Sequence, residues 1–188
     1  MKNALILHGT DASSKDNWFP WLGKELEQQG WQVWAPDLPK ANKPNIERYN
    51  RFLFSQKEFA SINEETVMIG HSSGAVAILG FLQALPAEIR ISHAILVAAF
   101  RNNLGWESLN ELFAVPFDFE KIKQKATKFT LIHSDNDPYI PLEQAAYLKE
   151  KLGGELIILK GQNHFSEVMD PKYNQFPFLI ELLNKEQQ

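Results

Sequence analysis

Short apolar runs alternate with longer segments of helical pattern along the chain, and this alternation restricts the possible folds more than any other feature. The short runs predict strands at Ala4–Leu7, Gln32–Ala35, Thr66–Ile69, Ala94–Ala98, Phe129–His133 and Glu155–Leu159. The intervening segments carry apolar residues at helical spacing and predict helices at Trp18–Gln29, Ile46–Phe59, Ser73–Leu85, Phe119–Ala126, Leu142–Leu152 and Phe176–Asn184. This order is typical of a mainly parallel sheet whose strands are joined by right-handed crossovers.

The strand-like runs are unbroken apolar stretches rather than alternating ones, which indicates that both faces of the sheet are buried. The predicted architecture is therefore an α/β fold, a three-layer α/β/α sandwich around a sheet of about six strands. The chain has 188 residues, the length of one domain, so we expect a single domain over residues 1–188. A fold of this length buries roughly 70% of its extended-chain surface and needs no cross-links.

Composition excludes several classes of function. The net charge of −4 leaves no basic footprint for nucleic acid. The absence of cysteine removes disulfides, thiolate metal sites and a cysteine nucleophile, and it fits a reducing compartment. The opening "MKNALILHG" is too short an apolar run for a signal peptide and is better explained as a first strand. We expect a cytoplasmic protein with no membrane or nucleic-acid partner, because the longest apolar stretch falls well short of the ~18 residues that a membrane span needs.

Chemically useful side chains follow the predicted strands at the point where each strand ends. In open parallel sheets, ligands bind at the carboxyl ends of the strands. One edge of the sheet should therefore gather His8, His71, His133 and His164, together with Asp135 and Asp137. His93 precedes its predicted strand and should lie at the opposite edge.

The pentapeptide Gly70-His71-Ser72-Ser73-Gly74 joins a predicted buried strand to a predicted buried helix. In a Gly-x-Ser-x-Gly turn, a strained strand-to-helix reversal holds the serine hydroxyl outward, and the glycines avoid collisions as the chain turns. A chance match in a chain of this length occurs on the order of one time in twenty at ordinary glycine and serine frequencies. The alternative is a small-residue turn that only lets strand and helix pack closely, but the flanking apolar runs favour Ser72 as a nucleophile.

A serine hydroxyl needs a base, and the base needs an orienting carboxylate. His164 follows the last predicted strand, and Asn163 before it tolerates the left-handed backbone of a tight turn. Both Asp135 and Asp137 follow the fifth strand; we favour Asp137, because Pro138 fixes the backbone beside it, and keep Asp135 as the alternative. The oxyanion of an acyl-transfer reaction would be bound by the backbone N–H groups of Ser73 and Thr10.

These segments together resemble a known family. The stretches "NWFPWLGKELE", "APDLP", "GHSSGAVA", "AILVAAF", "VPFDFEKIK", "HSDNDPYIP" and "GQNHF" are similar to those of the α/β-hydrolase superfamily. Within it, the chain resembles the small, lid-free group of retinoblastoma-binding protein 9 and the YdeN-like bacterial serine hydrolases. The resemblance implies a sheet of order 2-1-3-4-5-6 in this chain's strand numbering. It also implies Ser72 as nucleophile, Asp137 as acid and His164 as base.

The segment after the fourth strand, from Phe100 to Phe117, is too short for a cap domain. Within it, four apolar side chains either form a wall over Ser72 or only close the core, and both interpretations stay open: Trp106, Leu109, Leu112 and Phe113. An uncapped site favours small acyl esters, amides or thioesters, so the expected partner is a small-molecule acyl substrate.

We expect neither a cofactor nor a metal. A metal site at His133, Asp135, Asp137 and His164 would lack the ligand spacing of known motifs, and no dinucleotide or P-loop motif occurs. The alternative function is a binding or interaction module on a hydrolase fold.

Overall fold

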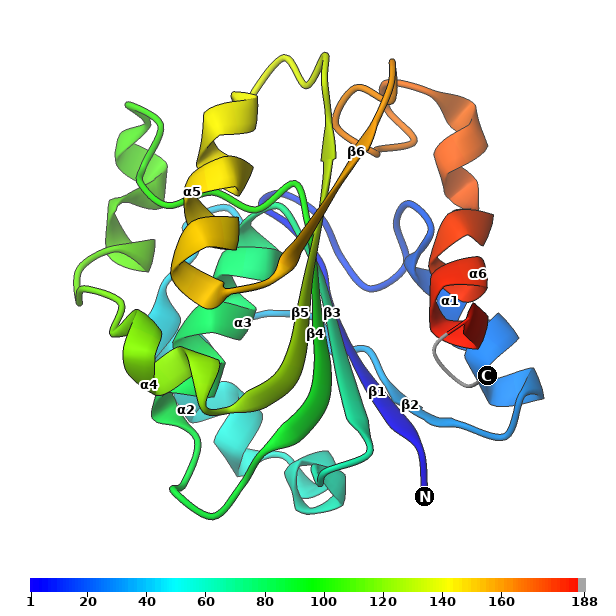
Figure 1. Cartoon of the computed structure of the whole chain (residues 1–188), viewed down its shortest axis with the longest axis vertical. Coiled ribbons are helices and arrows are strands. Elements are labelled where there is room, and N and C mark those ends of the chain that lie inside the picture. The colour runs from blue at the N-terminus through cyan, green and yellow to red at the C-terminus, as the bar shows by residue number, and fades with distance from the viewer. Residues whose placement is uncertain (186–188) are drawn as a thin grey trace.

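A computed structural model describes residues 1–185 of the chain. Its sheet has six parallel strands in the order β2-β1-β3-β4-β5-β6 (Figure 1). The strands are β1 Asn3–Leu7, β2 Gln32–Trp34, β3 Thr66–His71, β4 Ile91–Val97, β5 Ala126–Ser134 and β6 Glu155–Leu159. The predicted α/β class, strand number, parallel pairing and strand order are all confirmed.

Helices cover both faces of this sheet. They are α1 Phe19–Gln28, α2 Ile46–Ser55, α3 Ser73–Ala84, α4 Phe119–Lys123, α5 Leu142–Leu152 and α6 Pro177–Lys185. Helices α1 and α6 lie together on one face, and α2 to α5 lie on the other (Figure 1). None of the helices within residues 1–185 is long and apolar enough to cross a membrane.

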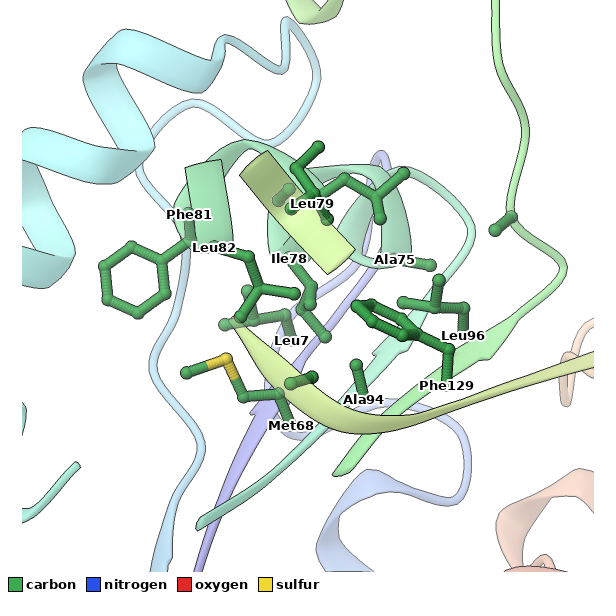
Figure 2. Close-up of a cluster of buried hydrophobic side chains, with 14 of the residues drawn as sticks. Leu7, Met68, Ala75, Ile78, Leu79, Phe81, Leu82, Ala94, Leu96 and Phe129 are labelled. Carbon is green, nitrogen blue, oxygen red and sulfur yellow. The ribbon is translucent and has the colours of Figure 1, made fainter. Parts of the chain in front are cut away.

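Side chains of each central strand alternate between two hydrophobic clusters, one on each face of the sheet. In β3, for example, Met68 packs into the cluster beneath α2 to α5, whereas Val67 and Ile69 pack into the cluster beneath α1 and α6. Because successive strand residues point to opposite faces, burial on both faces requires the unbroken apolar runs seen in the sequence. Figure 2 shows the first cluster, with Ala75, Ile78 and Leu82 of α3 above the strand side chains.

Helix α3 is almost wholly enclosed, since every residue from Ser73 to Leu82 is buried. It lies over the centre of the sheet and begins directly after the turn at Ser72. An apolar surface on all sides of a helix is expected only for a helix in the interior. The second apolar run of the Gly-x-Ser-x-Gly region is therefore a central core helix, which holds the turn rigidly at the carboxyl edge of the sheet.

Several predicted boundaries are wrong. The helix predicted over Ile46–Phe59 ends at Ser55, where the Ser55 hydroxyl bonds to the Phe52 carbonyl, and a 3₁₀ turn at Lys57–Ser61 follows. Phe59 still packs on Phe54 and Phe81, so the apolar spacing continues although the helix does not.

Further corrections concern the strands β4 and β5. The helix predicted over Phe119–Ala126 is only the five residues of α4, and Ala126 already begins β5, where it pairs with Ile91. Strand β4 begins at Ile91, so His93 lies inside the strand rather than before it, and its Nε2 is 2.9 Å from the Thr130 hydroxyl. Long-range pairing between the two strands thus overrides the local helical pattern.

Candidate active site

Ser72 occupies a backbone conformation that most side chains avoid, with φ of 56° and ψ of −125°. The strain is held by packing around the two glycines of the motif. A Cβ on Gly70 would lie 2.6 Å from the Ala75 Cα, and one on Gly74 would lie 2.4 Å from the carbonyl oxygens of Leu7 and His8. Strand and helix therefore approach each other as closely as glycine allows, which gives the strained turn a structural cause.

Substitution of Gly74 tests this packing. We expect Gly74→Ala to lower the free energy of unfolding by about 3 kcal/mol or more, because the new methyl group would meet rigid backbone atoms. The matched control is Gly23→Ala in α1, where the added Cβ would make an ordinary 3.6 Å contact with Val33 and would stabilise the helix by about 0.5–1 kcal/mol. Urea unfolding of both variants measures the difference, and equal effects would contradict this explanation of the turn.

His164 and Asp137 lie side by side at the same edge of the sheet. The His164 Nδ1–H donates to Asp137 Oδ2 over 2.7 Å, and the Asp137 side chain is fully buried. The other carboxylate oxygen, Oδ1, accepts the backbone N–H groups of Tyr139 at 2.9 Å and Ile140 at 3.1 Å. Every strong interaction of this carboxylate therefore holds it in one orientation toward the imidazole.

The electrostatics of Asp137 favour the carboxylate. Burial acts to raise its pKa, but the hydrogen bond and charge of His164, with the two backbone N–H donors, outweigh burial and leave the pKa below its ordinary value. An ionised Asp137 keeps the imidazole proton on Nδ1. The other ring nitrogen, Nε2, then carries the lone pair and is free to accept a proton.

The structure brings Asp137, and not Asp135, to His164. Asp135 Oδ1 instead accepts the N–H of Gly161 at 2.7 Å, which ties the loop after β5 to the loop after β6. This carboxylate therefore anchors one loop to the other.

Further hydrogen bonds join the same two loops. Asn136 Oδ1 accepts the backbone N–H of Asn163 at 2.8 Å, and Asn136 Nδ2 donates to Asn163 Oδ1 at 3.0 Å. The Ser134 hydroxyl accepts the N–H of Gln162 at 2.9 Å. Asn163 has a φ of 51°, the left-handed conformation that the sequence predicted. The loop that carries Asp137 is therefore held against the loop that carries His164 by several hydrogen bonds.

The two predicted oxyanion donors are adjacent. The Thr10 hydroxyl donates to the Ser73 hydroxyl over 2.9 Å, so the loop after β1 is held against the start of α3. Among the hydrogen bonds of residues 1–185, neither the Thr10 N–H nor the Ser73 N–H has an acceptor. Both N–H groups are thus without a protein acceptor beside Ser72.

Two cavities meet at Ser72, and His164, Tyr139, Thr10 and Asp11 line both of them. The larger has a volume of about 570 Å³ and the smaller about 330 Å³. No hydrogen bond joins the Ser72 hydroxyl to His164 within residues 1–185, but both side chains face the same space. Catalytic hydrogen bonds are often formed only when substrate is present.

The predicted apolar wall is only partly found. Trp106 and Leu109 line the smaller cavity, whereas Phe113 does not and instead packs against Phe100 and Phe117. Leu112 is fully buried in the core. The segment forms a 3₁₀ turn over Glu107–Leu112 and not an α-helix. Phe113 lies just beyond this turn, at its C-terminal cap, so its position is not set by the helical spacing of the segment.

Sequence reasoning missed Tyr139. Its ring lies 5.2 Å from that of His164, edge to face, and 5.9 Å from that of Trp106. The available signal was its position two residues after Asp137 in "DNDPYIP", which places it at the same edge of the sheet. Tyr139 forms part of the boundary between the two cavities.

The other three histidines at this edge have structural partners. His8 Nδ1–H donates to the Gly9 carbonyl and Nε2 accepts the Leu38 N–H, so both of its ring nitrogens are occupied. His133 Nε2–H donates to the Ile140 carbonyl at 2.8 Å. His71 Nε2–H donates to the His164 carbonyl at 2.7 Å and so supports the backbone of the candidate base.

His71 should make the fold sensitive to acid. Its ring is enclosed by Trp18 and Phe19, and burial lowers its pKa to about 3. Burial also lowers the pKa values of His8 and His133. The unfolded chain, with an ordinary histidine pKa near ~6.5, binds a proton that the folded chain excludes, so stability falls as the pH drops from about 6.5 toward 3.

We expect His71 alone to remove about 2 kcal/mol of unfolding free energy between pH 6.5 and pH 5, at ~1.4 kcal/mol per unit. Urea unfolding at several pH values measures this slope. The variant His71→Asn should be less stable at neutral pH but show a shallower slope. An unchanged slope would show that His71 does not titrate as the buried environment requires.

Metal-binding geometry is not found at this edge: no group of three or more histidine and carboxylate side chains within residues 1–185 is arranged to hold an ion. Instead, Asp137 is hydrogen-bonded to His164, and Asp135 is hydrogen-bonded to the backbone of Gly161.

Comparison with known proteins places the chain among hydrolases. A family model described as serine hydrolase matches residues 4–185. YdeN of Bacillus subtilis (strain 168), a candidate hydrolase, is 30% identical over 183 residues, which cover 97% of this chain and 94% of YdeN. The serine hydrolase RBBP9 of Rattus norvegicus is 30% identical over 168 residues and 86% of each chain.

Solved structures agree with these matches. The crystal structure of the B. subtilis ydeN gene product superimposes with a TM-score of 0.90 over 98% of both chains. The meta-cleavage product hydrolase CumD of Pseudomonas fluorescens IP01 matches with a TM-score of 0.70 at 15% identity, over 99% of this chain and 92% of CumD. At that identity the likeness concerns the fold alone, and it identifies the fold as that of the α/β-hydrolases.

Proposed function

The chain belongs to the serine hydrolase family and is a hydrolase, and from this premise we propose that it cleaves small acyl esters, thioesters or amides with Ser72, His164 and Asp137. The observation that carries the proposal is the 2.7 Å hydrogen bond between His164 and a buried Asp137, beside a strained serine turn that opens into the same cavities.

The first half of the reaction acylates the enzyme. Ser72 Oγ attacks the substrate carbonyl carbon while His164 Nε2 takes the hydroxyl proton, and the carbonyl electrons move onto oxygen. The N–H groups of Ser73 and Thr10 bind this oxyanion. As the tetrahedral intermediate collapses, the bond to the leaving group breaks, and the proton on His164 passes to the leaving oxygen, sulfur or nitrogen.

The second half releases the acid. A water molecule gives a proton to His164 Nε2 and attacks the carbonyl carbon of the Ser72 ester, and the intermediate collapses with return of the proton to Ser72 Oγ. Asp137 remains ionised throughout. Its role is to hold the Nδ1–H tautomer and to stabilise the imidazolium that forms in each half-reaction.

The short connection after β4 supports a small substrate. Residues between β4 and α4 form only a 3₁₀ turn and connecting loops, so no cap domain covers the site. The two cavities, of about 570 and 330 Å³, have the dimensions of small-molecule sites. This supports short acyl or aryl groups as substrates rather than long-chain lipids.

Fluorophosphonate labelling tests the nucleophile and sorts the substrates in one experiment. The folded wild-type protein should be labelled, and mass spectrometry should locate the adduct on the peptide that contains Ser72. Acyl esters, thioesters and amides that are turned over should slow labelling in competition. A folded protein that the probe does not label would refute the proposal and favour a binding role on the same fold.

A further inference from the structure

The two cavities that meet at Ser72 differ in chemistry. Beyond the residues that both cavities share at their boundary, Asp11 among them, the smaller one is walled by Phe100, Leu104, Trp106, Leu109 and Ile140. Apolar walls of this kind favour an apolar group by roughly 25 cal/mol per Å² of surface removed from water and disfavour a charge. This cavity, the apolar cavity below, suits the acyl chain of a substrate.

The larger cavity carries negative charge. Asp16 and Glu167 line this cavity alone, Asp11 lies at the boundary that it shares with the smaller cavity, and no lysine or arginine among residues 1–185 lines it. The Asp16 carboxylate is already hydrogen-bonded within its own loop, because its Oδ2 accepts the backbone N–H and the hydroxyl of Ser13. The carboxylates of Asp11 and Glu167 have no such bonds among the described interactions and are exposed at the rim. We call this space the acidic cavity.

A buried acceptor lies at the wall of the acidic cavity, independent of those carboxylates. His71 lines the cavity and is only 3% exposed. Its Nε2–H is used by the His164 carbonyl, and its Nδ1 has no hydrogen-bond partner within the described residues. That Nδ1 lies beside Gly9, at 3.6 Å from where a Cβ would stand, and Gly9 also lines the cavity. An unpaired buried acceptor calls for a donor.

The charge state of His71 strengthens this point. Burial lowers the pKa of the ring to about 3, so at neutral pH the ring is uncharged and Nδ1 offers a lone pair. The acidic cavity thus combines an acceptor with carboxylates and lacks lysine and arginine. A group with N–H donors and a positive charge complements both features.

We propose that the enzyme prefers substrates in which an apolar acyl group is joined to a leaving group bearing a primary ammonium, with the acyl group in the apolar cavity and the ammonium in the acidic cavity. The proposal rests on the proposed serine hydrolase function of Ser72. It adds a substrate class and an orientation to that function.

Three esters of nearly equal size distinguish the effect of a positive charge from the effect of its position in the substrate. The first is 4-ammoniobutyl hexanoate, with the cation on the leaving group. The second, pentyl hexanoate, replaces the ammonium by a methyl group. The third, butyl 6-ammoniohexanoate, is an isomer of the first with the cation on the acyl side. We expect kcat/KM about tenfold higher for the first ester than for either other ester at low salt, with the advantage in KM. The advantage should shrink at high salt, because the rim charges are screened.

Charge removal at the rim provides the matched variants. The double variant Asp11→Asn with Glu167→Gln keeps the shape of the cavity, and asparagine tolerates the positive φ of 55° at position 11. In this variant, the ratio of kcat/KM for the first ester to kcat/KM for the second should fall from about ten to near one. The control removes two charges elsewhere, with Glu27→Gln and Glu150→Gln on exposed positions of α1 and α5, and should keep the wild-type ratio.

The outcomes are distinct. Equal turnover of all three esters by the wild type would overturn the cation preference while leaving the serine hydrolase function intact. Preference for the third ester would overturn the assigned orientation. A preference that survives in the rim variant would show that Asp11 and Glu167 do not cause it. Absence of turnover together with absence of fluorophosphonate labelling would instead refute the proposed function itself.

Discussion

Replacement of Ser72 by alanine should lower kcat for ester hydrolysis by about 10⁴- to 10⁶-fold and abolish labelling by fluorophosphonates. The magnitude is that of removing the nucleophile from a serine–histidine–aspartate triad, since the remaining binding and oxyanion groups alone accelerate hydrolysis only modestly. Because the Ser72 side chain makes no hydrogen bond among residues 1–185, its loss should leave the free energy of unfolding nearly unchanged. Initial-rate kinetics and urea unfolding measure the two quantities.

Ser73→Ala is the matched control for this prediction. The proposed role of Ser73 uses its backbone N–H, which alanine retains. The change removes only the 2.9 Å hydrogen bond from the Thr10 hydroxyl, so we expect a loss of less than tenfold in kcat and normal labelling. If the two alanine variants were equally damaged, the turn would not present Ser72 alone to substrate, and the assignment of the nucleophile would be wrong.

Asp137→Asn should reduce kcat by about 10³- to 10⁴-fold. The amide would fit the same space, but it would no longer favour the Nδ1–H tautomer of His164 or stabilise the imidazolium, which is the known effect of this exchange in a triad. Substrate binding does not use this carboxylate, so KM should change little. Single-turnover and steady-state kinetics distinguish the two effects.

Asp135→Asn, two residues away, makes the same chemical change without the same consequence. Its Oδ1 can still accept the Gly161 N–H, and the residue makes no contact with His164 among the described interactions. We expect kcat within about threefold of wild type, because a neutral acceptor retains this net contribution of about 1 kcal/mol. A larger loss for Asp135→Asn than for Asp137→Asn would mean that the wrong aspartate has been assigned to the imidazole.

The local pattern of apolar residues and glycines in the sequence is sufficient to predict the sheet and the turn at Ser72. Unbroken apolar runs predicted buried strands, and Gly70 and Gly74 predicted a close strand-to-helix turn, because these features depend on side-chain period and on the space beside a glycine. Local pattern was insufficient where distant strands compete for the chain. Ala126 has helical neighbours but pairs with Ile91 of β4, and this pairing, 35 positions away in the sequence, decides its structure.

The sequence by itself determined the parallel sheet, the strained turn at Ser72 and the gathering of histidines and aspartates at one edge, since strand ends meet there whatever their exact contacts. Only the tertiary structure decided which aspartate meets His164, that Phe113 leaves the site while Tyr139 joins it, and that the space at Ser72 divides into apolar and acidic cavities. Each of these depends on where loops from different strands come to lie against one another. Those positions are set by contacts between residues far apart in the chain, such as Asn136 with Asn163, and local residue pattern does not encode them.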